Sequence, residues 1–241
     1  MSGYSYTDIF DTKGIEYLII IGFMLLMIPF WIFLNRPLKV RQNVMKSLGV
    51  LLLDTLRIPP GIFYSRNHTW THMEKSGHAR IGLDDLLLHI TGGVEVRYVR
   101  NPGERVKKGD LLAEITRNGK QLNIASPVSG EIKRVNSGLS ENPETLMNDP
   151  YGEGWMYKVK PDKWIEETAS CYLAGEAIEW TGRELQRFKD FISMAVHRHS
   201  PGTSTVILQE GGELCDHPLS GMPDEVWQDF QSSFLDREGK K

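Results

Sequence analysis

Short runs in which apolar and polar residues alternate occupy the middle of the chain, from about residue 64 to residue 164. Alternation of this kind is typical of strands that bury one face, and the segments between the runs are rich in the Gly, Pro and Asn that turns require. The expected strands are His78–Leu83, Gly92–Asn101, Gly109–Thr116, Lys120–Pro127, Gly130–Asn136 and Trp155–Pro161. Residues 83–91 are apolar enough for a short helix or a buried turn. The pattern predicts a mainly β fold, a small sandwich or barrel.

A second pattern, a continuous apolar run without charge, covers residues 17–35. Its length approaches the ~20 residues that a helix needs to cross a bilayer core. A cleaved signal peptide would require a basic leader, but residues 1–16 carry three acidic side chains against one lysine. A buried soluble helix is disfavoured because so long an apolar run is rare in soluble proteins. The run predicts a transmembrane helix at 17–35, preceded by a short extracytoplasmic N-terminus at 1–16.

The basic residues around this run predict its orientation. One cation, Lys13, precedes it, whereas five follow it, namely Arg36, Lys39, Arg41, Lys46 and Arg57. Because basic residues stay on the cytoplasmic side, we expect a single-pass protein of the cell inner membrane, with its N-terminus outside and the bulk of the chain in the cytoplasm. A periplasmic adaptor of an efflux pump, which also joins one anchor to a small β-module, is the alternative that this orientation disfavours.

The segment between the apolar run and the alternating region predicts a basic amphipathic helix. From Arg36 to Ile58, apolar residues recur at helical spacing among the cations, and Pro59-Pro60-Gly61 forms a hinge. Such a helix at 36–61 would lie on an anionic leaflet or pack against a partner subunit, and the sequence does not separate the two.

Residues 165–241 form a C-terminal extension with α and β character. One or two helices are expected between residues 165 and 196, and a strand at Ser204–Gly211. A turn then leads into a helix that places Trp227, Phe230 and Phe234 at helical spacing. These aromatic rings either pack as core against the β-module or form an exposed anchor for a partner protein.

Composition narrows the functional classes. Of 241 residues, 40% are hydrophobic and 24% charged, and the net charge is −3, so neither global disorder nor a basic nucleic-acid-binding protein is indicated. The two cysteines, Cys171 and Cys215, lie far apart and form no zinc spacing, which fits a reduced cytoplasmic setting. No nucleophile elbow, phosphate loop or dinucleotide motif is present, so neither enzymatic activity nor a small-molecule substrate is expected.

Histidine pairs raise the question of a metal site. His68 and His72 flank Trp70, and His197 and His199 would share one face of an extended segment. Neither pair has a third ligand nearby in the sequence, so no metal site is expected.

The alternating region resembles a known family, the glycine cleavage system H protein. The blocks that carry the resemblance are YSRNHTW, IGLDD, VKKGDLLAEI, SPVSGEIKRVN, SENPE and NDPYGEGWMYKVKP, between Tyr64 and Pro161. The resemblance implies that residues 62–164 form a lipoyl-type barrel-sandwich hybrid. It also explains His68 and Trp70, which match a structural motif of the family.

The resemblance implies a function for one hairpin, because the family carries lipoic acid on a lysine at a hairpin tip. The family's pattern is ESVKAxSDxxAPVSGE, and this chain has TRNGKQLNIASPVSGE. When the two are aligned on PVSGE, the modified lysine falls on Gly119, and the glutamate three positions earlier falls on Thr116. Lys120 lies one residue too late.

The residues of this hairpin themselves argue against modification. Asn-Gly between apolar runs is the strongest signal for a type I′ turn, with Asn118 and Gly119 at its tip. Arg117 and Lys120 would then flank the turn on the strands. A ligase must receive a protruding lysine, so we expect no lipoate and treat a lipoylated Lys120 as the alternative.

Together these features predict a non-catalytic accessory or docking subunit without a cofactor. We expect it to bind the membrane and other protein subunits on the cytoplasmic face of a membrane complex, and not nucleic acid. Analogy favours an energy-conserving oxidoreductase of electron transport as that complex. The alternative is a membrane-tethered lipoyl carrier modified on Lys120.

Overall fold

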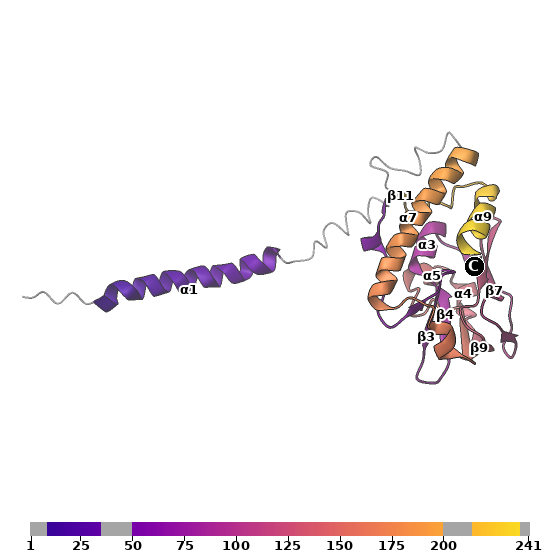
Figure 1. The fold of residues 1–241 in the computed structure, drawn as a ribbon, viewed down its shortest axis with the longest axis horizontal. Coiled ribbons are helices and arrows are strands. Elements are labelled where there is room, and N and C mark those ends of the chain that lie inside the picture. The colour runs from indigo at the N-terminus through magenta and orange to yellow at the C-terminus, as the bar shows by residue number, and fades with distance from the viewer. Residues whose placement is uncertain (1–8, 35–49, 200–213, 237–241) are drawn as a thin grey trace, which may run out of the picture. The chain divides into compact units, whose positions relative to one another are not determined.

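The computed structural model describes residues 9–34, 50–199 and 214–236. The chain divides into two compact units, residues 1–44 and 45–241, which are described separately. Figure 1 shows a single helix in the first unit, and strands covered by helices in the second.

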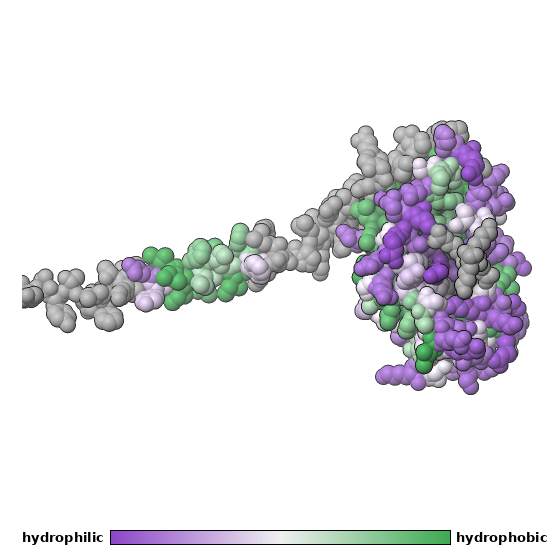
Figure 2. Space-filling model, viewed as in Figure 1, coloured by the Kyte–Doolittle hydropathy of each residue, from purple (hydrophilic) through white to green (hydrophobic). Residues whose placement is uncertain are grey.

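The first unit contains helix α1, Ile9–Leu34, which includes Pro29. Its described side chains are apolar and exposed from Tyr17 to Trp31, and Figure 2 shows them in green and pale shades. Within the ranges that the structure describes, no helix is both long and apolar enough to cross a membrane. The transmembrane helix at 17–35, whose last residue lies outside these ranges, stays a prediction from the sequence.

The second unit is built on two antiparallel sheets. The larger sheet has the order β2-β3-β4-β10-β9-β6, and the smaller has the order β5-β7-β8. The strands are β2 (Phe63–Tyr64), β3 (Thr69–Met73), β4 (Ala79–Leu83), β5 (Glu95–Tyr98), β6 (Arg105–Val106), β7 (Leu111–Arg117), β8 (Lys120–Ala125), β9 (Gly130–Val135) and β10 (Tyr157–Pro161). Each of the six runs expected from alternation overlaps one of these strands, so the mainly β prediction is confirmed.

Both sheets bury their inward residues in one core. Ile81 of β4 and Val159 of β10 lie in the same buried cluster as Ile115 of β7 and Leu122 of β8. Short helices close the ends of this module, namely α3 (Asp85–Thr91), α4 (Gly138–Glu141), α5 (Thr145–Asn148) and α6 (Trp164–Thr168). The side chain of Asp84 caps α3 by accepting a hydrogen bond from the amide of Leu87 at 2.8 Å.

The C-terminal extension shares this core. It comprises α7 (Ala174–His199), β11 (Leu214–Cys215), α9 (Asp224–Phe230) and the π-helical turn η2 (Gln231–Leu235). Phe188 of α7 packs edge-to-face against Phe230 of α9, with the ring centroids 5.7 Å apart. The expected strand Ser204–Gly211 lies outside the described residues.

The aromatic residues of the extension are core residues. Trp227, Phe230 and Phe234 are at most 2% exposed, and the Trp227 indole donates to the carbonyl of Leu219 at 2.9 Å. Of the two roles that the sequence leaves open for these rings, the structure fits packing in the core, because side chains this buried offer almost no surface to a partner protein.

The amphipathic helix expected over residues 36–61 is wrong where the structure describes it. Val50 and Leu51 form strand β1 and pair with Cys215 and Leu214, and Leu53–Thr55 is one turn of 3-10 helix, η1. Leu51 and Leu56 are buried in the core cluster. The apolar residues in this stretch are therefore part of the core of the second unit. Residues 36–49 lie outside the described ranges.

Candidate functional site: the β7–β8 hairpin

The hairpin joining β7 to β8 has the two-residue turn that Asn-Gly predicts. Arg117 pairs with Lys120 across the strands, and Asn118 and Gly119 between them have φ angles of 51° and 80°. Two consecutive positive φ values define a type I′ turn, whose twist matches that of the flanking strands. Both tip residues are exposed. The tip is therefore a tight turn that carries no lysine.

Lys120 lies on the inward face of the hairpin. Side chains alternate along β8, so Lys120 shares its face with the buried residues Leu122 and Ile124. Its ammonium group donates a hydrogen bond to the carbonyl of Met222, in the loop before α9. The amine is half-buried and bound to the chain's own C-terminal extension.

Arg117 is held on the same face by α3. Its guanidinium donates to the carbonyl of Thr91 at 2.8 Å. The guanidinium occupies the space where a side chain at Gly92 would begin, because a Cβ there would lie 1.6 Å from Arg117 Nη1. Like charges directly opposite each other destabilise a strand pair. Here the carbonyl of Thr91 binds Arg117 and the carbonyl of Met222 binds Lys120, and these two contacts offset the repulsion between the cations.

The free edge of β8 is covered by the extension. Gln231 of η2 accepts from the amide of Asn123 at 2.7 Å through its side-chain oxygen, and donates to the carbonyl of Asn123 at 3.3 Å. A glutamine that bonds both main-chain groups of one residue replaces the next strand of the sheet at that position. The extension therefore closes the hairpin along its edge as well as its inward face.

Within the described ranges, no group of three or more His, Cys, Asp or Glu side chains is arranged to hold a metal ion. His68 is buried, His72 contacts the carbonyl of Gly61 at 3.1 Å, and His197 lies in helix α7 rather than in an extended segment.

The glycine cleavage H-protein family model matches residues 62–183, just over half of the chain. The chain belongs to the glycine cleavage H-protein family. It is 34% identical over 113 residues to a probable glycine cleavage system H protein of Pyrococcus abyssi, covering 46% of this chain and 82% of that protein. It is 30% identical over 105 residues to the H protein of a Psychrobacter species, covering 44% and 83%.

A crystal structure of the H protein from Mycobacterium marinum aligns with 29% identity and a TM-score of 0.40, over 43% of this chain and 86% of that chain.

Family membership confirms the resemblance and the H-protein-like fold of the module. The family match ends at residue 183, within α7, so it extends beyond the boundary at residue 164 that the sequence predicts. The remainder of α7 and all of α9 and η2, which cover the hairpin, lie outside the match.

Sequence reasoning found the turn but missed what covers it. Asn118-Gly119 indicates the turn and places Lys120 on the strand beside it, not at the tip. The sequence gives no signal for the contacts of Met222 and Gln231. Met222 lies 102 positions from Lys120, and Gln231 lies 108 positions from Asn123, and each contact uses a main-chain group, which any residue type has.

Proposed function

We propose that this H-protein family member is a non-catalytic docking subunit that works without lipoate. The observation that carries the proposal is the position of Lys120, whose amine lies on the covered face of the hairpin and bonds to Met222. A ligase that attaches a cofactor to lysine needs an amine that protrudes. A module that has kept its fold but not an accessible lysine is suited to binding other proteins.

We further propose that helix α1 attaches this module to a membrane complex on its cytoplasmic side. The support is the exposed apolar side chains of Tyr17–Trp31, which water disfavours. The basic residues after the apolar run support the orientation. An energy-conserving oxidoreductase is the proposed complex by analogy with the redox role of lipoyl-type modules.

Purification of the full chain from its native membrane in mild detergent tests this function. We expect membrane subunits to co-purify in stoichiometric amounts, and we expect them to be absent when residues 9–34, which form α1, are deleted. A chain that remains in the soluble fraction and elutes alone would contradict the docking role. Substitution of exposed residues on β5, such as Arg97→Ala, is a matched control that leaves α1 intact.

A lipoyl carrier modified on Lys120 is the second candidate, favoured by family membership. It requires the extension to leave the hairpin so that the amine is released from Met222. Intact-mass measurement of the same preparation separates the two candidates, because lipoylation adds mass that Lys120→Arg would remove.

A further inference from the structure

Two histidines connect the H-protein module to its C-terminal extension in the same manner. Each imidazole lies between a carboxylate of the module and a carboxylate of the extension. The two module carboxylates are consecutive residues, Asp84 and Asp85, at the start of α3. His68 faces Asp84 and His89 faces Asp85.

The first bridge is fully buried. His68 Nδ1 lies 2.8 Å from Asp84 Oδ2, and His68 Nε2 lies 3.6 Å from Glu184 Oε2 on α7. Glu184 is also paired with Arg187 of the same helix. The Nδ1 contact is a hydrogen bond, whereas Nε2 makes no hydrogen bond to any described residue and faces Glu184 as an ion pair. An imidazole directs an N–H at two carboxylates at once only in its protonated form.

The electrostatics of the first bridge agree with this geometry. Burial lowers the pKa of His68, but the charges of Asp84 and Glu184, with the Asp84 hydrogen bond, outweigh burial and raise it to about 9. For Glu184 burial acts in the opposite direction and raises the pKa. The interactions with His68 and Arg187 outweigh burial and lower the pKa of Glu184 below its usual value. Both partners are therefore charged at neutral pH.

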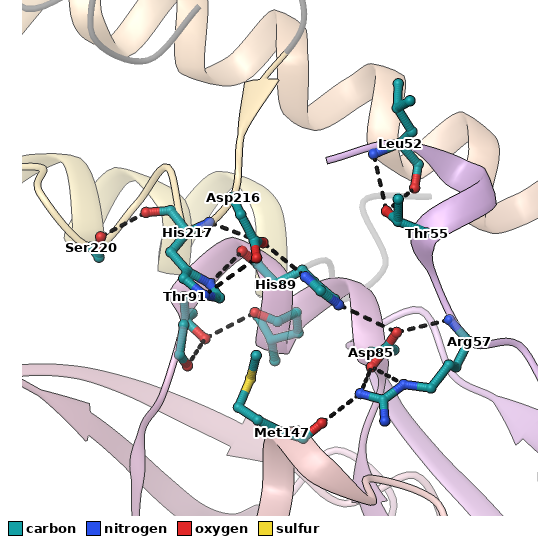
Figure 3. A network of polar contacts seen from close by, with 12 residues as sticks. Leu52, Thr55, Arg57, Asp85, His89, Thr91, Met147, Asp216, His217 and Ser220 are labelled. Carbon is teal, nitrogen blue, oxygen red and sulfur yellow. Dashed lines mark hydrogen bonds and ion pairs between the residues drawn. The ribbon is translucent and has the colours of Figure 1, made fainter. Parts of the chain in front are cut away.

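The second bridge runs along α3, from Asp85 in its first turn to His89 in its last turn, and is drawn in Figure 3. His89 Nδ1 is 2.8 Å from Asp216 Oδ1, and His89 Nε2 is 3.6 Å from Asp85 Oδ2. Asp85 is also bound by Arg57, and Asp216 faces His217 at 3.4 Å. Burial raises the pKa of Asp216, but the hydrogen bond and charge of His89, and then His217, lower it overall.

Residues 214–236, which we call the C-terminal segment, contact both bridges. Asp216, near the beginning of the segment, belongs to the second bridge. Near its end, the ring of Phe234 stacks on His68 with centroids 5.3 Å apart, and the guanidinium carbon of Arg187 lies 3.7 Å from the centroid of the same ring. Between these ends lie Met222 and Gln231, which bind the hairpin.

We infer that the C-terminal segment is a pH-sensitive cover of the β7–β8 hairpin, fastened near its end where Phe234 stacks on His68, whose ring stands between Asp84 and Glu184. Loss of the proton from His68 leaves these two carboxylates beside an uncharged ring. The contact of Phe234 with His68 and with α7 is then weakened. The segment then opens and releases Lys120 and the edge of β8 while the two sheets stay folded.

The direction of the pH effect follows from the raised pKa of His68. A group whose pKa is higher in the folded state contributes its full stabilisation below its unfolded value, 6.5, and loses it as pH rises through about 9. The cover is therefore closed at neutral pH and opens in alkaline solution. The second bridge is partly exposed, so solvent screens its contribution.

Hydrogen exchange of the full-length chain, followed by mass spectrometry and corrected for the intrinsic pH dependence of exchange, tests this inference. Peptides from 120–125 and 214–236 should lose protection by at least about tenfold between neutral pH and pH ~9.5, as expected for a linked pKa shift of more than one unit. Peptides covering β3 and β4 should keep theirs. Equal loss in all peptides, or no loss in any, would overturn the inference.

Two variants separate titration of the bridge from general destabilisation. Glu184→Gln keeps the shape of the side chain but removes its charge, so opening should move to lower pH. His68→Gln should open at every pH and lose the pH dependence. His72→Gln is the matched control, because His72 contacts the carbonyl of Gly61 and no carboxylate. If Glu184→Gln opened at the same pH as the unaltered chain, the bridge would not be the fastening.

Discussion

The two-sheet module and the C-terminal extension fill one core, but they are tied into the molecule by different kinds of contact. Main-chain hydrogen bonds between neighbouring strands hold the module, as in the pairing of β7 with β8. The extension is held mainly by buried aromatic rings and by side chains that reach main-chain groups of the module, such as Gln231 at Asn123. Its main-chain hydrogen bonds to the rest of the unit are scattered, as from His217 to the carbonyl of His89 at 2.9 Å. A substitution that breaks strand pairing in the module should therefore unfold the whole module. A substitution that removes a contact of the extension should open the extension alone.

The largest effect should come from emptying the shared core. Phe230→Ala removes a ring that is fully buried against Phe188, and should lower the free energy of unfolding by about 3–5 kcal/mol. Phe191→Ala, at a half-buried position of the same cluster, should have a smaller effect. Denaturant unfolding measures both. A loss of less than about 1 kcal/mol for Phe230→Ala would contradict the burial of its ring in a shared core.

The next effect concerns the buried histidine bridge. Because the pKa of His68 is raised to about 9, the free energy of unfolding should fall as pH rises from about 6.5 to above 9, by on the order of 3 kcal/mol. Urea denaturation at a series of pH values measures this fall. His68→Gln should flatten the curve over that range, and a curve of unchanged shape would mean that His68 is not charged in the folded protein.

The third prediction compares two adjacent glycines, Gly92 and Gly93, of which Gly92 alone lies against the Arg117 guanidinium. Gly92 has a φ angle of 78°, and a Cβ there would overlap Arg117, so Gly92→Ala should destabilise the protein by about 1–3 kcal/mol. Gly93→Ala is the matched control, because a Cβ at Gly93 has no atom within 4 Å. Thermal unfolding of the two variants measures the difference. Similar melting temperatures would contradict the close approach of Arg117.

The smallest effect should be confined to the hairpin edge. Gln231→Ala removes both bonds to Asn123 and should destabilise the chain by only about 1–2 kcal/mol. The amide of Asn123 should nevertheless exchange faster, whereas Leu122, which pairs with Ile115, should not change. Amide exchange by NMR resolves the two positions, and faster exchange at both would mean that the whole hairpin depends on Gln231.

More of the module than of the extension can be predicted from the sequence, because the signals of the module are local. Strand alternation and Asn118-Gly119 are local signals, since period-two burial and a type I′ turn are properties of adjacent residues. The helical spacing of apolar residues between Arg36 and Ile58 predicts a helix, but short apolar runs do not reveal whether they lie in a helix or pair with a distant strand. The turn signal places Lys120 on a strand, but its inward face and its acceptor at Met222 depend on how the extension folds back.

We propose that this hairpin carries no cofactor, because Lys120 is covered and the tip has no lysine. Incubation of the purified full-length chain with a lipoyl ligase tests this by intact mass, beside a Gly119→Lys variant that places a lysine at the tip. We expect the original chain to stay unmodified and the variant to gain one lipoyl group at position 119. A lipoyl group on Lys120 of the original chain would contradict it.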